Sequence, residues 1–407
     1  MALPVETIGP FIVDTWLDGK STGIGHHIDT LEEVFIKTER ANLDLPAEAC
    51  ALQSLSGSIG IPAIHWFGTA FGQRTMVTDM HGPSLESMFD ECGRYFDTAM
   101  LLEFANQLIF RLESMHSQQI SHGNLDLSCF SIGSAPWQSP QIVLTGLGSG
   151  NFSLFDARKD LEAVGDILLH LATGSQSRDE LQGLARHSFE LPSFLRIYFE
   201  FIWGTEINPA DYVVLRHHLH VARQGLSKRT LFGGSDSLGE EQSSLKFMAG
   251  KNTGDLFDTL GTTMSIVGQL GEKTKSWKND EAASIIQRLD EIMSIFMVLL
   301  MRDKPSRKRQ KYLMGAHHLP NRLWRDLRWY IRMAAHGSTS LQRLVNLRIY
   351  RFLGALIEII PVYNRYWTAH LSEVAYCLMN LDSEASISWR RAWIYWKDCA
   401  NLLSRRK

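Results

Sequence analysis

The chain has 407 residues, of which 44% are hydrophobic and 21% charged, a composition typical of a globular protein with one to three packed cores. We expect no secretory signal, because the N-terminal MALPVETIGPF has neither a basic region nor an apolar core. The longest apolar run, Ile292 to Met301, is too short to span a bilayer. The five cysteines follow no disulfide or zinc spacing, so we predict an intracellular protein without membrane segments.

The net charge of −3 conceals an uneven distribution. Residues 301–407 contain 20 lysines and arginines against 7 aspartates and glutamates, a net charge of +13. The other 300 residues carry 21 against 37, a net charge of −16. This asymmetry indicates which partners the chain attracts rather than which fold it adopts. The basic run Arg307–Lys311 has the composition of a nuclear-localisation signal, which favours the nucleus over the cytoplasm.

The first third of the chain alternates short apolar runs with turn-like segments, the pattern of a strand-rich region with a few helices. We predict strands at 10–17, 33–37, 60–67 and 75–80, with glycine-rich turns at 19–25 and 68–72. The glycines of DGKSTGIG do not form the GxGxxG loop that covers phosphates, so a hairpin is the preferred interpretation. Helices are predicted at 45–56, at 83–92 with Ser84 as N-cap, and at 97–116.

The rest of the chain is predicted to be helical on both sides of a Gly- and Ser-rich linker at 225–254. Before the linker we expect helices at 160–172, 192–203 and 212–221. After it we expect helices at 255–270, 280–301, 341–360, 367–380 and 388–403. The predicted fold class is therefore α+β, with a mixed domain at 9–224 and a basic, all-α domain at 255–407.

Several ordered motifs give the mixed domain a resemblance to a known family. Val34-Phe-Ile-Lys37 is similar to the Val-Ala-Ile-Lys strand of protein kinases, and Glu48 follows on a helix. The remaining matches lie at 60–68, 81–89, 160–165 and 194–215. Residues 9–224 thus resemble a protein-kinase domain of the casein kinase-1/vaccinia-related kinase group. His122-Gly-Asn124 and Gly146-Leu-Gly148 look most like an inactive member. The resemblance implies a bilobal kinase-like domain, whereas the C-terminal region resembles no family that we recognise.

The resemblance also implies that the catalytic residues are lost. The position of the catalytic base is Asn124, whose amide cannot accept a proton near neutral pH, and the catalytic-loop lysine is replaced by Asp126. The two metal-binding positions are Cys129 and Gly146, and a shift of register to Leu144 or Thr145 supplies no carboxylate either. About a dozen residues separate Gly148 from Asp160, too few for the activation segment of an active kinase. We therefore predict no catalysis, no cofactor and no metal site.

Lys37 and Glu48, by contrast, are retained. They are interpreted either as the remnant of a nucleotide pocket or as a structural salt bridge between strand and helix, and the salt bridge is preferred because the phosphate loop and the metal ligands are both missing. Asp126 is expected to be a helix cap or a surface charge, Cys129 a small buried residue and His122 a packed core histidine. The adjacent histidine pairs at 26–27, 217–218 and 317–318 do not favour a metal site, because neighbouring side chains rarely face one ion.

The basic tail mixes arginines with aromatic residues, and the candidate partner-binding residues are Arg325, Arg328, Arg332, Arg390 and Arg391. Arginines that pair with phosphates and aromatic faces that stack bases suit single-stranded nucleic acid. Alternatively, the aromatic residues form the core of a helical bundle, and the arginines bind an acidic protein surface, including the chain's own acidic body.

Three functions follow from these observations. The first is an inactive pseudokinase that acts as a scaffold with protein partners. The second is a nucleic-acid-binding protein that uses residues 301–407. The third is a residual nucleotide binder with atypical transferase activity. The oligomeric state is not predicted.

Overall fold

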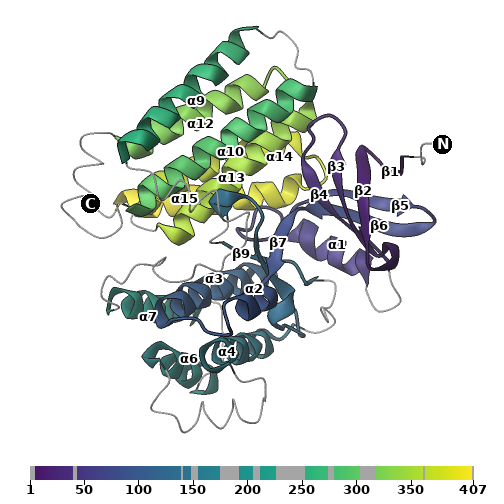
Figure 1. The fold of residues 1–407 in the computed structure, drawn as a ribbon. Coiled ribbons are helices and arrows are strands. Elements are labelled where there is room, and N and C mark those ends of the chain that lie inside the picture. Colours follow the sequence, from purple (N-terminus) through teal and green to yellow (C-terminus); the bar gives the residue numbers. More distant parts are fainter. Residues whose placement is uncertain are drawn as a thin grey trace.

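The computed structural model describes residues 5–39, 44–138, 141–147, 155–174, 192–204, 211–225, 253–273, 279–302, 318–360 and 363–405. Within these ranges the fold is α+β, as predicted: an N-terminal antiparallel sheet is followed by a helical C-terminal region (Figure 1). The predicted linker at 225–254 and the basic run Arg307–Lys311 lie almost entirely outside the described residues. Each described helix is too short or too polar to cross a membrane.

The N-terminal sheet has six strands in the order β1-β2-β3-β4-β6-β5, and each neighbouring pair is antiparallel. Its apolar face buries a small core of five residues, namely Ile8, Phe11, Val34, Ile36 and Val77. Helix α1 (Leu45–Ser54) follows β4, is capped by Asp44 and packs beside β5 and β6. The strands are β1 (Thr7–Ile8), β2 (Phe11–Leu17), β3 (Thr22–His27), β4 (Glu33–Thr38), β5 (Ile64–Ala70) and β6 (Gln73–Asp79).

The predicted glycine-rich turn at 19–25 is wrong in its second half. Gly23 and Gly25 lie inside β3, where a Cβ atom on Gly25 would come within 2.2 Å of the Ile12 carbonyl oxygen. Glycine is therefore required by the close approach of two strands rather than by a turn. The strand predicted from residue 60 begins at Ile64, and the following turn is confined to Phe71 and Gly72.

A second, helical part follows the sheet at Met80. A three-stranded sheet has the order β7-β8-β9. Its strands share one hydrophobic core with helices α2, α3, α4, α6 and α7. Ser84 caps α2, as predicted, and Asp97, which was expected to be the first residue of its helix, caps α3 instead. The elements are β7 (His81–Ser84), α2 (Leu85–Glu91), α3 (Thr98–Ser117), β8 (Phe130–Gly133), β9 (Ile142–Leu144), α4 (Ala157–Thr173), α6 (Ser193–Gly204) and α7 (Asp211–Gly225).

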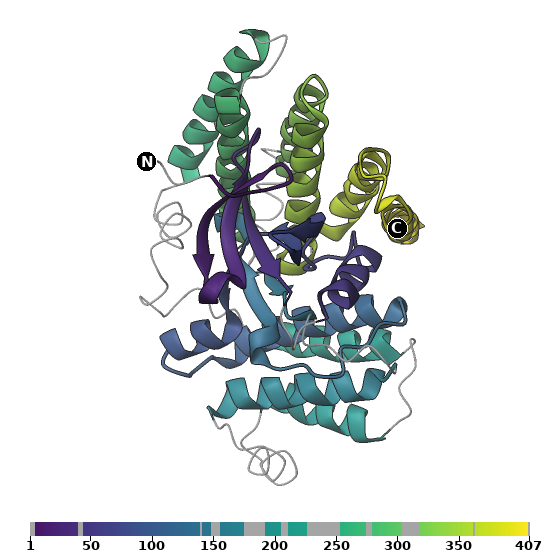
Figure 2. The same cartoon turned by 90° about the vertical axis from the view of Figure 1, so that its right-hand side faces the viewer.

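The C-terminal helices form a layer that borders both the sheet and α3 (Figures 1 and 2). Their apolar faces make one continuous core, to which Ile59 and Trp137 of the N-terminal half also belong. Helix α13 has the most buried positions among the described C-terminal helices, and α10, α13 and α15 all contact the N-terminal half of the chain. The helices are α9 (Thr253–Lys273), α10 (Asn279–Arg302), α12 (Leu319–Ala334), α13 (Thr339–Ile359), α14 (Asn364–Leu381) and α15 (Ser386–Arg405).

Candidate functional site

The loop around His122 and Gly123, which the resemblance compared with a catalytic loop, is held in place by Asp160 of α4. The buried carboxylate of Asp160 accepts hydrogen bonds from the backbone N–H groups of His122 (2.7 Å) and Gly123 (2.6 Å). It also contacts Nε2 of His116 at 2.9 Å. A buried carboxylate with three polar partners fixes the path of the backbone, because breaking any of these contacts would leave a buried charge unsatisfied.

His122 packs as a neutral core residue, as the sequence suggested. Its Nε2 donates to the Gly146 carbonyl oxygen at 2.9 Å, since a carbonyl can only accept, and its Nδ1 accepts from the Asn124 N–H at 3.3 Å. Both contacts fit the same neutral tautomer. Burial lowers the pKa of His122, which favours this uncharged form further. The ring therefore links the loop to the segment around Gly146.

Asp126, which the resemblance compared with the catalytic-loop lysine, caps the short 3-10 helix η2 (Leu127–Cys129). Its carboxylate accepts from the backbone N–H groups of Ser128 (2.8 Å) and Cys129 (3.2 Å), and from the Ser128 hydroxyl. The capping role that the sequence allowed is thus confirmed. The side chain lies at the rim of an open groove of about 650 Å³, which Asn124 also lines.

Cys129 and Gly146 lie against one another. Cys129 is buried, and its carbonyl oxygen accepts from the N–H groups of Thr145 (2.8 Å) and Gly146 (3.0 Å). A Cβ atom on Gly146 would lie 2.6 Å from Cys129 Cα and 2.8 Å from its Cβ. Atoms that are not bonded do not approach this closely, so any side chain at position 146 requires the backbone of η2 to move. Position 146, which the resemblance compared with a metal-binding aspartate, thus has no room for a side chain.

Lys37 and Glu48 form the ion pair that the resemblance implied. Lys37 Nζ lies 2.6 Å from Glu48 Oε1 and donates to the Thr145 carbonyl oxygen at 3.3 Å. The pair is largely buried, so it is less screened than a surface pair. It joins β4, α1 and the segment before Gly146, an arrangement that fits both the structural salt bridge and the remnant nucleotide pocket considered from the sequence.

An aromatic pair that the sequence analysis missed lies beside Lys37. The ring of Phe35 in β4 packs on the ring of His81 in β7, with centroids 4.7 Å apart and planes inclined at 54°. Side chains alternate along a strand, so Phe35 and Lys37 project from the same face of β4. Burial lowers the pKa of His81, so its ring is neutral. The signal was available, because Phe35 stands where the Val-Ala-Ile-Lys pattern has alanine.

The five candidate arginines do not form one surface. Arg325, Arg328 and Arg332 lie on the exposed face of α12, which packs on α10 and α13. Arg390 and Arg391 lie on α15, which packs on α14. Arg325 is 73% exposed and contacts Asp326, Arg328 is 3.9 Å from Glu373, and Arg391 donates to Gln118 at 2.6 Å.

Most aromatic residues of the tail are core residues rather than exposed stacking surfaces. Tyr330, Trp367, Trp389 and Trp396 are all buried. Trp324 stacks on His370 with ring centroids 4.0 Å apart. Tyr395 is the most exposed of the tryptophans and tyrosines in α12 and α15, at 47%. The bundle-core interpretation therefore holds for the buried rings.

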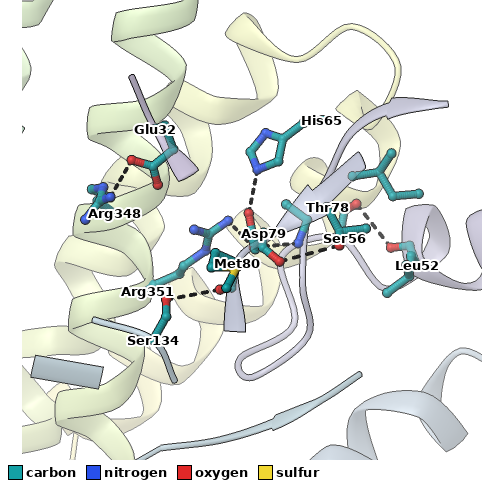
Figure 3. Close-up of polar contacts among 12 residues, drawn as sticks. Glu32, Leu52, Ser56, His65, Thr78, Asp79, Met80, Ser134, Arg348 and Arg351 are labelled. Carbon is teal, nitrogen blue, oxygen red and sulfur yellow. Dashed lines mark hydrogen bonds and ion pairs between the residues drawn. The ribbon is translucent and has the colours of Figure 1, made fainter. Parts of the chain in front are cut away.

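Three arginines of α13 that were not selected from the sequence contact the rest of the chain, and Figure 3 shows two of them, Arg348 and Arg351. Arg351 pairs with Asp79 at the end of β6, and Arg348 pairs with Glu32 and with Asp290 of α10. Burial alone would raise the pKa of Asp79, but Arg351 and His65 hold it below its usual range. Arg343 donates to the Ile64 carbonyl oxygen at 3.0 Å. Part of the basic tail is thus neutralised by the acidic body, one of the partners that the sequence analysis considered.

No protein-family model matches the chain. In the ranges that the structure describes, histidine, cysteine, aspartate and glutamate side chains form no group of three that could hold a metal ion. Function is therefore inferred from the geometry of the loop around Asn124, the Lys37–Glu48 pair and the contacts of the C-terminal helices.

Proposed function

We propose that this chain is a catalytically inactive protein of the protein-kinase-like fold, related to the casein kinase-1/vaccinia-related kinase group, that serves as a scaffold for protein partners. The sheet order β2-β3-β4-β6-β5, with a helix after the lysine-bearing strand β4, supports the kinase-like part of the proposal. So does the ion pair between Lys37 and Glu48, because active kinases require such a pair between strand and helix. The division of the chain at Met80 into a sheet part and a helical part is also what a bilobal kinase-like domain would have.

The observation that carries the inactive part is the contact between Gly146 and Cys129. Phosphoryl transfer depends on positioning and on magnesium that neutralises the phosphate charge. Here the metal-binding position has no side chain and no room for one, since a Cβ atom would lie 2.6 Å from Cys129 Cα. The two groups that border it, Asn124 and Asp126, are an amide and a capping carboxylate. Position 146 therefore supplies no metal ligand and the Asn124 amide supplies no proton acceptor, while the Asp126 carboxylate is engaged in capping η2.

A phosphotransfer assay with purified full-length protein tests this proposal. We expect no magnesium-dependent phosphorylation by the wild type and none by Asn124→Asp/Gly146→Asp, because the second substitution displaces η2. Lys37→Ala is the matched control. Activity in the wild type that Lys37→Ala abolishes would show the chain to be an enzyme. For the scaffold, the partners that co-purify with the wild type should also co-purify with Lys37→Ala, with or without Mg-ATP.

A second candidate function is anion binding, with nucleic acid as the anion, through α12. Arg325, Arg328 and Arg332 occur at i, i+3 and i+7, so they follow one exposed stripe of the helix. Binding to RNA or DNA should then fall steeply with salt and be lost in Arg325→Glu/Arg328→Glu/Arg332→Glu, but not in Arg390→Glu/Arg391→Glu. Equal loss in both variants would indicate a nonspecific effect of charge, and no binding at low salt would exclude this function.

The third candidate, a residual nucleotide binder with atypical transferase activity, is supported by the Lys37–Glu48 pair alone. The aromatic pair of Phe35 and His81 opposes it, because these rings fill space beside Lys37.

A further inference from the structure

Helix α13 contacts the N-terminal sheet region through several residues, among them Arg343, Tyr350 and Arg351. Near its start, the Arg343 guanidinium donates to the Ile64 carbonyl oxygen and to Nδ1 of His65, both at 3.0 Å. Two turns later, the Tyr350 hydroxyl donates to the Gly57 carbonyl oxygen at 2.6 Å. Arg351 then pairs with Asp79. These groups belong to β5, to the connection between α1 and β5, and to the end of β6, so the helix holds several separate segments of the sheet region.

The last two turns of the same helix contact the helical part that follows the sheet. The Glu358 carboxylate accepts from Arg111 of α3, at 3.0 Å from Nη2, and from Gln141 Nε2 at 2.8 Å. Arg111 also donates to the Ile142 carbonyl oxygen. Phe352 packs edge-on against Trp137, with ring centroids 5.6 Å apart. Helix α13 therefore contacts both the sheet region and the helical region of the N-terminal half.

The chain passes from the N-terminal sheet to the helical part at Asp79 and Met80, close to these contacts of α13. Asp79 is the last residue of β6 and Met80 connects it to β7. The Asp79 carboxylate accepts from the Ala63 N–H at 2.8 Å and from His65 at 2.6 Å, in addition to its pair with Arg351. Figure 3 shows Arg348 and Arg351 reaching from α13 to Glu32 and Asp79. The contacts of Asp79 with Ala63 and His65 lie within the sheet region, so a rotation of the sheet about Met80 relative to α13 would break the pairs of Arg351 with Asp79 and of Arg348 with Glu32.

We infer that α13 is an internal clamp that holds the sheet region and the α2–α7 region in one fixed relative orientation. The reason is geometric. An α-helix is stiff along its axis, and its contacts run from Arg343 to Glu358, about 22 Å along that axis. If the two regions moved relative to one another, the buried ion pair of Arg351 with Asp79 or that of Glu358 with Arg111 would have to separate. The inference does not rest on the proposed function, since it uses only these contacts.

A distance measurement between the two regions tests the clamp. Spin labels on unnatural amino acids at Gln73 of β6 and Glu200 of α6, both exposed, report the separation of the sheet and helical regions in the full-length protein. We expect one narrow distance distribution in the wild type and at least a twofold broader one in Arg343→Gln/Arg351→Gln. Arg158→Gln, which removes an exposed pair with Glu162, is the matched control and should resemble the wild type.

An unchanged distribution in a folded Arg343→Gln/Arg351→Gln variant would overturn the inference. If that variant does not fold, Asp79→Asn/Arg351→Gln replaces both charges of one pair and leaves no buried charge unpaired, so it is the milder test. The same broadening is expected there, and its absence overturns the inference equally. A broad distribution in the wild type would also contradict it.

Discussion

Arg111 and Glu358 are 247 positions apart in the sequence, yet their side chains meet in a bidentate ion pair in the interior, 0% and 4% exposed. The Arg111 guanidinium also donates a hydrogen bond to the Ile142 carbonyl oxygen, and the Glu358 carboxylate also accepts one from Gln141. Breaking such a pair from one side leaves the other charge buried without its partner. This pair thus ties the stability of the N-terminal half to the last third of the chain.

We predict that Arg111→Met lowers the free energy of unfolding by about 3–5 kcal/mol, and that Glu358→Leu costs a similar amount. The double variant should cost less than the sum of the two by about 1.5 kcal/mol or more, because it leaves no unpaired charge. Urea denaturation followed by circular dichroism measures these changes. Arg158→Met, at an exposed pair, should change stability by less than about 0.5 kcal/mol. Additive single effects would argue against coupling between Arg111 and Glu358.

Gly60 provides a second test of the packing around Arg111. Its φ is +72°, and a Cβ atom there would lie 1.9 Å from Arg111 Nε. Gly60→Ala should therefore cost about 3 kcal/mol, the sum of left-handed strain and displacement of the guanidinium. Gly72 has a similar φ of +76° with nothing within 4 Å, so Gly72→Ala should cost only about 1 kcal/mol. Equal melting temperatures for the two variants would contradict the close contact with Arg111.

Phe35→Ala tests whether the aromatic pair excludes nucleotide. The wild type should show no shift of melting temperature with ATP, with or without magnesium, because Phe35 and His81 fill the space beside Lys37. Phe35→Ala opens that space, and we expect ATP to raise its melting temperature by about 2 °C or more at millimolar concentration. Phe67→Ala, at an exposed position of β5, is the control and should behave as the wild type. An ATP response in the wild type would favour the residual nucleotide binder.

His370 makes stability depend on pH. Burial, and then the nearby Arg328, lower its pKa to about 4 from the ordinary histidine value of 6.5. The folded state therefore binds fewer protons than the unfolded state between these values, and stability is complete above pH 6.5 and falls as the pH drops towards 4. His370→Phe retains an aromatic ring against Trp324, 4.0 Å away in the wild type, but cannot be protonated.

Between pH 7 and pH 4.5, His370→Phe should lose less stability than the wild type, by about 2 kcal/mol. Denaturation curves at the two pH values provide the measurement. Other buried histidines, such as His122, contribute in the same direction and are common to both proteins. Parallel losses in the two proteins would mean that His370 is as accessible to protons in the folded chain as in the unfolded one.

Local signals predicted the helices well. The helix expected at 97–116 is observed at Thr98–Ser117, and the one expected at 341–360 at Thr339–Ile359, because apolar spacing and caps such as Asp97 act within a few residues. The glycines of β3 misled the prediction, since their close contact with Ile12 comes from strand pairing and not from the local sequence. The capping role of Asp126 could be predicted from the sequence, because its hydrogen-bond partners lie only two and three residues further along the chain.

The contacts of α13 were not predicted, because their partners are separated by hundreds of residues. Arg348 and Glu32 are 316 positions apart, and no local pattern relates them. One signal was present. Glu358 interrupts the apolar run LGALIEII, and a charged residue in such a run is rarely buried without a partner. This indicates a buried ion pair, although the sequence does not identify Arg111 as the partner.

The Arg111–Glu358 pair also has a consequence for the synthesis of the chain. At about 5–20 residues per second, the ribosome needs about 12–50 s to proceed from Arg111 to Glu358. During that interval the nascent N-terminal half holds an arginine whose buried partner does not yet exist. Its final packing must therefore wait for the C-terminal helices, in contrast to the usual order in which N-terminal domains fold first. Translation that stops before α13 would release a chain unable to complete its N-terminal core, and we expect quality-control proteases to degrade such products.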